Sequence, residues 1–599
     1  MSTAREKAEF FLAHEQAFRL GSLPTECSNP KTARFSQTAA GEVAAGIRML
    51  ASVDAEILPV AERVFGSAEF ARLVDALADA GRSGKRICFS GCGATGRLSI
   101  LLEAAWRRFW QELQTSHPQV GARLADFEPC AVSIMTGGDH ALIRSVEGFE
   151  DYTSFGRHQV TELGLGRGDV LVATTEGGET SSVIGTAWQA LEAGAQVFFV
   201  FNNPAPVLVA RVERSRQVIE EPRITKLDLA TGPMAIAGST RMQATSIELL
   251  VIGGALEMAM VRLLQERLSP AEFAQLGVEP RAAADYPRLF ADLLEQLSQP
   301  EAVAAMAGLV EFEEQIYRRQ GVITYLTDRF LLDVLTDTTE RAPTFRLPPF
   351  RKCDDRVSVP SWAFVKNPTC DTAEAWRQVL RRDARGLNWD TETYRQLGAS
   401  EGIQANPPKL NNSEILKFQI GREPDPARSQ RADSALLAIL VGDEAKRAAK
   451  ADDPLCRGIA QCAAGFPRVA AASIGPIALP AWAAQRFHVQ CQWPESVVDL
   501  WARLAVKLAL NSLSTTTMAR LGRVSGNWMV CVETSNKKLI DRGTRLIAEL
   551  AGMSYNEACY LLHETMEEVG PRQRATSDAP SPVALAIERA LAAKGTRRA

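Results

Sequence analysis

Histidines are few in this 599-residue sequence, and paired-cysteine motifs are absent. The six histidines are dispersed, and none of the eleven cysteines forms a C-x-x-C pair. Such a distribution provides no set of metal ligands close together in the sequence, although a site assembled from distant parts of the chain is still possible. We therefore predict a metal-independent protein without a cofactor. Scattered, unpaired cysteines are typical of reduced thiols, which predicts a cytoplasmic location.

An excess of basic residues and a long uninterrupted apolar run are also absent. Lys and Arg number 67 against 71 Asp and Glu, which gives a formal net charge of -4. The N-terminal stretch MSTAREKAEFFLAHEQ mixes charges with apolar residues, unlike a signal peptide. The most apolar long stretch, SIELLVIGGALEMAMVRLL, contains Glu248, Glu257 and Arg262, which predicts a buried helix. We expect no nucleic-acid partner and no membrane partner.

Short apolar strands alternate with helix-forming stretches over most of the chain. The first series contains RICFSG, CAVSIMTGG, DVLVATTEGG and QVFFVFNNP. After a helical stretch from Ala282 to about Gly321, a less regular series contains GVITYL, VSVPSWAFV, SALLAILVG and PRVAAASIG. Such alternation predicts parallel sheets covered on both faces. From Trp501 to about Val569 the pattern is helical again, which predicts a C-terminal helical cap.

A glycine-rich turn joins the first predicted strand to a helix. The segment RICFSGCGATGRLSILLEAAW (86–106) has G-x-G-x-x-G spacing. This spacing favours an anion, because backbone N–H groups and the positive end of the helix dipole point at the turn. A dinucleotide site would also need an acidic residue closing a second strand about 20 residues further on. The sequence there is polar and helical, so we predict a phosphate site instead.

A second polar loop, EGGETSSVIGTAW, follows the strand DVLVATT. Both loops lie at one edge of the sheet, because the carboxyl ends of parallel strands share that edge. The hydroxyl and backbone N–H groups of Thr175, Thr180 and Ser181 suit a phosphate monoester, with helix capping as the alternative. Glu176 and Glu179 would repel a phosphate, so we expect them to face sugar hydroxyls, a cation or solvent.

Four stretches together resemble the sugar isomerase (SIS) domain family that contains N-acetylmuramic acid 6-phosphate etherase and glucokinase regulatory protein. They are GCGATGRLSIL (91–101), GGDHALIRSVEGFED (137–151), GPMAIAGSTRMQATS (232–246) and KLALNSLSTTTMARLGRVSGNWMVCVETSNKKLIDR (507–542). In the short etherases the last two stretches run together, whereas about 260 residues separate them here. The resemblance covers roughly 45–570 and implies a second SIS copy, in an order most similar to glucokinase regulatory protein.

The resemblance implies an α/β fold of two SIS-type domains and a C-terminal helical lid. Each domain is expected to be a doubly wound parallel sheet, flavodoxin-like with three αβα layers. We predict an N-terminal helical segment at 1–45, a first SIS domain with intact phosphosugar loops at 46–270, a second with a degenerate phosphate loop at 271–534, and a helical lid and tail at 535–599. The fusion satisfies internally the interface of single-copy dimers, so we expect a monomeric pseudo-dimer.

The two copies depart from the family pattern in opposite ways. In YLTDRFLLDVLTDTTERAPTF (325–345) the Gly loop is replaced, but the ending survives as Asp337, Glu340, Pro343, Thr344 and Phe345. LAILVGDEAKRAA has acids where a Ser/Thr-Gly phosphate loop would lie. The first copy keeps its Gly loop but has Ala105 at the position of the family's glutamate. A helix rises ~1.5 Å per residue, so a side chain fourteen residues along lies ~20 Å from its start and reaches a neighbouring site more readily.

These departures predict one composite pocket, with Glu150 from copy one, Glu340 from copy two and Lys538 from the lid. The resemblance implies that Glu150 removes a proton and Glu340 protonates the departing oxygen when lactate leaves C3 of a 6-phosphosugar. Glu150 as a ligand of sugar hydroxyls, Glu340 as a surface relic, and Arg241 and Lys538 as solvated side chains are the alternatives. The predicted substrate-binding residues are Gly93, Ala94, Thr95, Gly96, Arg97, Thr175, Glu176, Gly177, Glu179, Thr180, Ser181, Ser239, Arg241 and Lys538.

Two classes of function stay open. The first is an enzyme acting on a 6-phosphosugar such as N-acetylmuramic acid 6-phosphate, as an etherase-like carbon–oxygen lyase or a sugar-phosphate isomerase. The second is a non-catalytic phosphosugar sensor that regulates a sugar kinase, as glucokinase regulatory protein does. The acid missing from its usual copy counts against the enzyme. The carboxylate-rich loop TTEGGETSS counts against the sensor.

Overall fold

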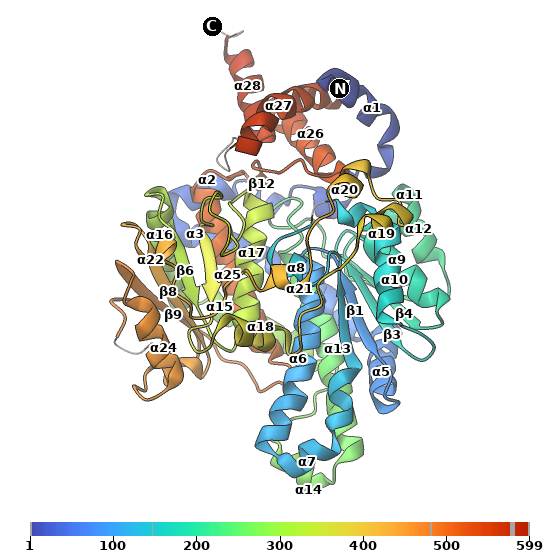
Figure 1. The fold of residues 1–599 in the computed structure, drawn as a ribbon, viewed down its shortest axis with the longest axis vertical. Helices are drawn as coiled ribbons and strands as arrows, with labels where there is room; N and C mark the ends of the chain where they lie inside the picture. Colours follow the sequence, from blue (N-terminus) through green and yellow to red (C-terminus); the bar gives the residue numbers. More distant parts are fainter. Residues whose placement is uncertain (1–2, 147, 480–481, 576–580, 597–599) are drawn as a thin grey trace.

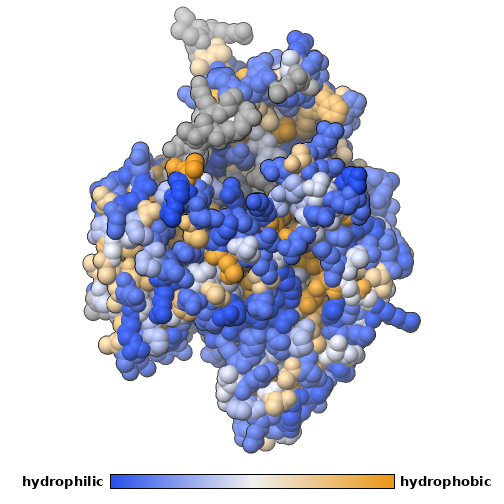
Figure 2. All heavy atoms as spheres, in the orientation of Figure 1, coloured by the Kyte–Doolittle hydropathy of each residue, from blue (hydrophilic) through white to orange (hydrophobic). Residues whose placement is uncertain are grey.

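Two parallel sheets lie side by side in the computed structural model, with helices on both faces and a group of helices above them (Figure 1). The structure describes residues 3–146, 148–479, 482–575 and 581–596. One cluster of buried apolar side chains runs through both sheet domains and the helical group. The predicted fold class of two doubly wound α/β domains with a helical C-terminal region is confirmed. Figure 2 shows a largely hydrophilic face with small, scattered apolar groups.

The first sheet has the strand order β2-β1-β3-β4-β5, with every pair parallel. Its strands are β1 (Ile87–Gly91), β2 (Ala131–Met135), β3 (Val170–Thr175), β4 (Gln196–Phe201) and β5 (Ile224–Asp228). The first four were predicted because they are continuous apolar runs. β5 was not predicted, because in ITKLD only Ile224 and Leu227 are buried. We call this sheet and its helices the first half.

The second sheet repeats this order as β7-β6-β8-β9-β10. Its strands are β6 (Ile323–Leu326), β7 (Ala363–Lys366), β8 (Ala435–Val441), β9 (Arg468–Gly475) and β10 (Gln485–Gln490). The strand predicted over VSVPSWAFV exists, but its predicted start at Val357 was wrong, since β7 begins only at Ala363. Pro360 has no N–H for a ladder, and Val357 is exposed to solvent. We call this sheet and its helices the second half.

Equivalent helices of the two halves meet between the sheets. α6 (Ala94–Ser116) follows β1 and packs against α17 (Leu331–Phe345), which follows β6. α13 (Gln243–Arg267) follows β5 and packs against α25 (Leu500–Arg520), which follows β10. α13 is the buried helix predicted from its apolar stretch. Within the described part of the chain, no helix has the length and apolar character needed to cross a membrane.

The remaining helices cover the sheets or extend from the helices beside them, as α7 and α14 do at the far ends of α6 and α13 (Figure 1). In the first half they are α4 (Ile57–Phe65), α5 (Ala68–Arg82), α7 (Pro118–Arg123), α8 (His140–Ile143), α9 (Thr153–Leu163), α10 (Ser181–Glu192), α11 (Ala205–Arg211), α12 (Glu213–Glu220) and α14 (Pro270–Gln275). In the second half they are α15 (Asp285–Leu297), α16 (Pro300–Arg318), α18 (Thr372–Leu380), α19 (Thr391–Gln396), α20 (Glu401–Ala405), α21 (Asn412–Ile415), α22 (Pro426–Ser429), α23 (Glu444–Ala448) and α24 (Pro454–Ala463).

The N-terminal helices contact distant parts of the chain. α1 (Ala4–His14) packs on α27 (Tyr555–Ala575), which forms the lid with α26 (Lys537–Ala551) and α28 (Pro582–Thr596). α2 (Phe35–Gly41) and α3 (Val43–Asp54) pack against α25 in the second half. A short hairpin, β11 (Val524–Ser525) and β12 (Trp528–Met529), precedes the lid. The boundaries at 45, 270 and 534 remain predictions, and 597–599 lie outside the described residues.

Candidate functional site

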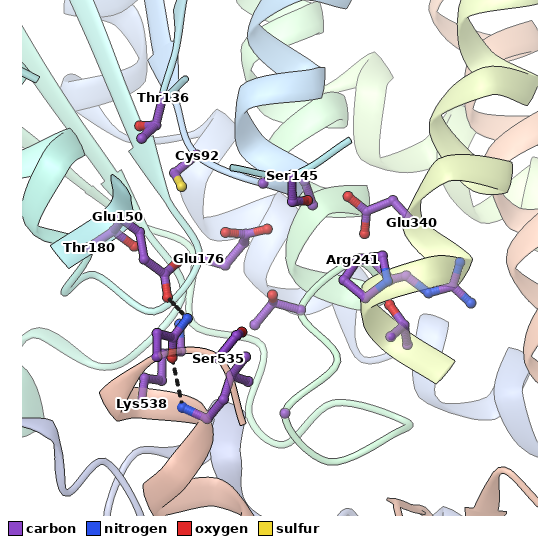
Figure 3. Close-up of a pocket in the computed structure, with 18 of the residues that line it drawn as sticks. Cys92, Thr136, Ser145, Glu150, Glu176, Thr180, Arg241, Glu340, Ser535 and Lys538 are labelled. Carbon is purple, nitrogen blue, oxygen red and sulfur yellow. Dashed lines mark hydrogen bonds between the residues drawn. The ribbon is translucent and has the colours of Figure 1, made fainter. Parts of the chain in front are cut away.

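A cavity of about 210 Å³ lies where the first half, α17 and the lid meet, and we call it the first cavity. It lies beside the N-terminus of α6. Figure 3 shows Glu150 and Glu176 of the first half, Glu340 of the second half and Lys538 of the lid around one space. The predicted site residues that line it are Gly93, Ala94, Arg97, Glu150, Glu176, Thr180, Ser239, Arg241, Glu340 and Lys538.

The loop after β1 is a tight turn that presents backbone to the cavity. Gly93 has a φ of 58°, in the left-handed region, so the turn favours glycine there. The Thr95 hydroxyl accepts the N–H of Cys92 at 3.0 Å and donates to the Cys92 carbonyl at 2.8 Å. A Cβ on Gly96 would meet the Met135 side chain at 2.7 Å. Thr95 and Gly96 therefore shape the loop, while Gly93 and Ala94 line the cavity.

The loop after β3 contributes two of its predicted residues to the cavity, Glu176 and Thr180. The Thr175 hydroxyl donates to the Thr180 hydroxyl at 3.0 Å. The Gly177 carbonyl accepts from the Asn203 amide at 3.0 Å. Ser181 is buried as the first residue of α10. Thr175, Gly177 and Ser181 therefore support the loop instead of lining the cavity.

Glu179 faces protein cations behind the cavity. Its carboxylate pairs with Arg214 at 2.5 Å and with Lys538 of the lid at 3.0 Å. Burial opposes ionisation, but Lys538 and Arg214 outweigh it and hold the pKa of Glu179 at about 2. Of the three surroundings that the sequence left open for Glu179, the structure selects a cation. The pair also ties the lid to the loop after β3.

Glu176 is the cavity carboxyl whose protonation is most perturbed. Its residue is 8% exposed. Burial, with the negative charges of Glu340 and Glu150, raises the pKa of Glu176 to about 7, against its own backbone N–H and Lys538. Behind it, burial and the charge of Glu176 raise the pKa of Glu248. Near neutral pH, Glu176 can therefore both give and take a proton.

Glu150 is held by the first turn of the lid. Its Oε1 accepts a hydrogen bond from the side-chain amide of Asn536 at 2.7 Å, drawn dashed in Figure 3. Asn536 is also the N-cap of α26, because its Oδ1 accepts the N–H of Leu539 at 2.8 Å. Asn536 was not predicted, although an Asn directly before the helical pattern KKLIDR is an N-cap signal. The lid helix and the candidate base are thus joined.

Glu340 reaches the first half from the middle of α17. Arg97 Nη1 of α6 donates to Glu340 Oε1 at 2.6 Å, and Arg97 Nε donates to the Leu142 carbonyl at 3.1 Å. Arg97 and Glu340 are 1% and 7% exposed. The alternative of a surface relic is therefore wrong for Glu340. The ion pair links the two halves. It also engages the guanidinium of Arg97, which was predicted to bind substrate.

Arg241 and Lys538 are both engaged with acidic side chains. Arg241 is buried, with its Nη1 3.1 Å from Asp337 Oδ1, so a solvated position is wrong for it. Burial lowers the pKa of Arg241 from its usual value, against the charge of Asp337. For Lys538 burial opposes the charge, but Glu179 and Glu150 raise its pKa. Both cations lie in the cavity lining with their charge already balanced in part.

A metal centre is not among the features of the described residues. Over 3–146, 148–479, 482–575 and 581–596, no three His, Cys, Asp or Glu side chains are grouped to hold a metal ion. Of the carboxylates of the first cavity, Glu150 bonds to Asn536 and Glu340 to Arg97.

One family model matches part of the half that carries the glycine loop. Residues 69–190 match the family model of the glucokinase regulatory protein N-terminal SIS domain. This stretch runs from α5 to α10 and includes β1, β2, β3 and both loops of the first cavity.

Curated proteins and a solved structure are also similar to this chain. An N-acetylmuramic acid 6-phosphate etherase of Rhodopirellula baltica is 29% identical over 246 residues, 41% of this chain and 71% of the relative. One of Rubrobacter xylanophilus is 26% identical over 292 residues, 48% and 85% of the two chains. The solved tagatose-6-phosphate ketose/aldose isomerase of Escherichia coli aligns over 80% of this chain and 96% of its own, with 11% identity and a TM-score of 0.39.

Proposed function

Because the chain belongs to the SIS-domain family that includes N-acetylmuramic acid 6-phosphate etherase and glucokinase regulatory protein, we propose that its first cavity binds a phosphosugar. The main support is that Glu150, Glu176 and Glu340, which come from both halves, line one cavity beside the N-terminus of α6. Carboxylates suit sugar hydroxyls and proton transfer, and the helix N-terminus suits a phosphate.

The phosphate is received where backbone and hydroxyl donors converge. Gly93 and Ala94 present the start of α6, and Thr180 and Ser239 add hydroxyl groups to the lining. The positive end of the helix dipole favours the anion at this place. The sugar then extends from the loop toward the carboxylates of Glu150, Glu176 and Glu340.

The reaction proposed is removal of the lactyl ether from N-acetylmuramic acid 6-phosphate. Glu150 takes the proton from C2 of the open-chain aldehyde, the C3–oxygen bond breaks, and a C2–C3 double bond forms. A carboxyl group protonates the departing lactate oxygen. Water then adds to the double bond, with its oxygen at C3, its released proton on the carboxylate of the donor, and the proton held by Glu150 returned to C2. Each correctly placed carboxyl contributes ~10²- to 10⁴-fold.

The proton donor is one of two carboxyl groups in the cavity. Glu340 is the assignment that the family resemblance implies. Glu176 is the second candidate, since a pKa of about 7 leaves it partly protonated at neutral pH, whereas Glu340 accepts from Arg97 at 2.6 Å. Separate replacement of the two side chains distinguishes them.

The deciding experiment combines ligand stabilisation with product analysis. Thermal shift is measured with N-acetylmuramic acid 6-phosphate, fructose 1-phosphate and fructose 6-phosphate, and lactate is assayed after incubation with the first. We expect stabilisation and lactate release. Glu150→Gln and the true donor variant, Glu340→Gln or Glu176→Gln, should lower the rate ~10²- to 10⁴-fold. Glu311→Gln on the exposed face of α16 is the matched control.

Stabilisation by fructose phosphates without lactate release would overturn the lyase and leave the sensor that regulates a sugar kinase. For either function we expect a cytoplasmic protein. We also expect a monomer, because α6 with α17 and α13 with α25 already pair the two halves within one chain. A dimer in light scattering would contradict that expectation.

A further inference from the structure

The internal repeat gives the first cavity a counterpart. The first cavity uses the N-terminus of α6 and the distal part of α17, where Glu340 lies. A second cavity, of about 320 Å³, uses the N-terminus of α17 and the distal part of α6, where Arg108 and Glu112 lie. Since α6 and α17 follow equivalent strands, the two cavities are related by the repeat.

In the second half, the backbone N–H groups of the loop after β6 already donate hydrogen bonds to a side chain of the protein. The Glu444 carboxylate accepts the N–H of Arg329 at 2.8 Å and of Asp328 at 3.2 Å, both in the loop after β6. It also accepts the N–H of Val441 at the end of β8, at 2.9 Å. A buried carboxylate thus takes the place that an anion would have at this loop. Any ligand of the second cavity must be held by side chains.

Those side chains are mainly arginines. Five of them, each from a different part of the fold, line the second cavity: Arg108, Arg329, Arg381, Arg447 and Arg503. Three acids, Glu112, Asp328 and Glu374, share the lining. Guanidinium groups present planar pairs of donors that match the oxygens of a phosphate.

The acids of this region balance most of the arginines but leave one without a close partner. Arg329 donates to both Glu112 oxygens, at 3.2 and 3.3 Å, and Arg447 lies 2.8 Å from Asp328. The one carboxylate that Arg381 approaches among the described residues is Glu112, at 3.9 Å. Arg381 is also held at a φ of 57°, in the left-handed region.

The positive charge of this cavity that lacks a close acidic partner therefore lies at Arg381, because Arg108 pairs with Asp499 and Arg503 pairs with Asp333. Burial first, and then the charges of Arg329 and Arg503, lower the pKa of Arg381 from its usual value, against Glu112. Burial and the same two arginines lower the pKa of Arg108 to about 10, although Asp499 and Glu112 favour its charged form. An anion placed among these groups would relieve their mutual repulsion.

We propose that the second cavity binds a small phosphorylated anion as an effector, separately from the first cavity. The position equivalent to Glu340 in the first half is Ala105, so the second cavity lacks the corresponding acid. The arginines thus provide binding without the chemistry proposed for the first cavity. The ligand class is a phosphate monoester or diphosphate of a small metabolite.

Calorimetric titration of the full chain with inorganic pyrophosphate tests this proposal. Ser239→Asp places a carboxylate in the first cavity and repels anions there, so binding that persists in Ser239→Asp belongs elsewhere. In that background Arg381→Gln should weaken binding at least about tenfold, because a charge-assisted contact is lost. Among the described residues the one ion pair of the Arg381 side chain is the long contact with Glu112. The backbone carbonyl of Arg381, which accepts from the Gln111 amide at 2.9 Å, is unchanged in Arg381→Gln, so we expect the fold to stay intact.

A second variant and a control complete the design. Arg447→Gln, on another element of the same cavity, should also weaken binding about tenfold. Arg395→Gln, in a surface pair with Glu392 on α19, should leave binding unchanged. Loss of all pyrophosphate binding in Ser239→Asp alone, or unchanged affinity in both cavity variants, would overturn the proposal.

Discussion

The two halves have the same strand order but differ in the loop after their first strand, which faces a cavity in the first half and is bonded to an acidic side chain in the second. After β1, the turn at Cys92 and Gly93 is kept tight by the Thr95 hydroxyl and faces the first cavity. After β6, the N–H groups of the equivalent loop are bonded to the Glu444 carboxylate. One acidic side chain from a neighbouring loop can therefore take the backbone N–H groups that would otherwise bind an anion, while the strand order stays the same.

The same division extends to the charges beyond the loops. The first cavity has Glu150, Glu176 and Glu340 in its lining, whereas five arginines line its counterpart. The helices α6 and α17 contribute to both cavities. Carboxylates for proton transfer are thus concentrated in one cavity and cations for anion binding in the other.

The largest change to this comparison is expected from Glu444→Ala. The substitution leaves the N–H groups of Asp328, Arg329 and Val441 without their acceptor in a buried place. We expect the free energy of unfolding to fall by about 3 kcal/mol, measured by urea denaturation. Asp443→Ala removes an exposed neighbour that pairs with Lys446, and should cost less than about 0.5 kcal/mol. Equal stability of the two variants would show that the loop does not depend on Glu444.

A smaller, pH-dependent effect is expected from Glu176→Gln in the first half. Burial, with Glu340 and Glu150, raises the pKa of Glu176 from 4.5 to about 7. The folded state therefore binds this proton more tightly, and wild-type stability falls as pH rises from about 4.5 to 7.

Glutamine removes that loss. The variant should exceed the wild type in free energy of unfolding by about 2 kcal/mol at pH 8, and by much less at pH 5. Glu549→Gln, at an exposed position of α26, should show no such difference between the two pH values. A stability gain of Glu176→Gln that is the same at both pH values would contradict the assigned shift.

The third effect in size concerns the contact between the lid and the first half. Lys538→Met removes the cation 3.0 Å from Glu179, which keeps Arg214 as a partner. We expect a loss of about 1.5 kcal/mol, and faster amide hydrogen exchange in α26. Lys537→Met, which breaks a more exposed pair with Glu15, should cost about 0.5 kcal/mol or less. Unchanged exchange in α26 would mean that other contacts fix the lid.

How far the fold could be predicted depended on how each strand is buried. Central strands such as β3 and β8 are buried along their whole length, so their apolar runs identified them. β5 and β10 are edge strands with mixed burial, and QRFHVQ of β10 gives no apolar run. The helical pattern from Trp501 predicted a C-terminal cap, but its first helix, α25, packs between the two halves, and the lid helices begin only at Lys537. The packing of α1 on α27 brings together the two ends of the chain and leaves no local signal.

The candidate site was predictable where a family motif or a glycine turn marked it. Gly93, Glu150 and Glu340 were found in this way, and all three line the first cavity. Partners across the fold were not predictable, because nothing local specifies them: the lysine of the lid pairs with Glu179, and Arg97 pairs with Glu340. Glu444 was noticed only as an acid in a phosphate loop, since two of its backbone partners, Asp328 and Arg329, lie more than 100 residues away.

The smallest effect, and the most local test of the comparison, is Thr95→Val. Thr95 holds the turn after β1 through both of its bonds to Cys92, whereas Phe330 occupies the equivalent place after β6. Valine keeps the shape but removes the hydroxyl, so we expect a loss of about 1 kcal/mol in urea denaturation.

Ligand binding should respond more than stability to this change. With the turn loosened, the backbone N–H groups no longer converge, and Thr95→Val should lose the thermal shift given by a phosphosugar. Thr95→Ser keeps the hydroxyl and should retain it. If valine binds as well as serine, the backbone of Gly93 and Ala94 holds its conformation without the hydroxyl. The contrast between the loops would then rest on the occupation of the second loop by Glu444 alone.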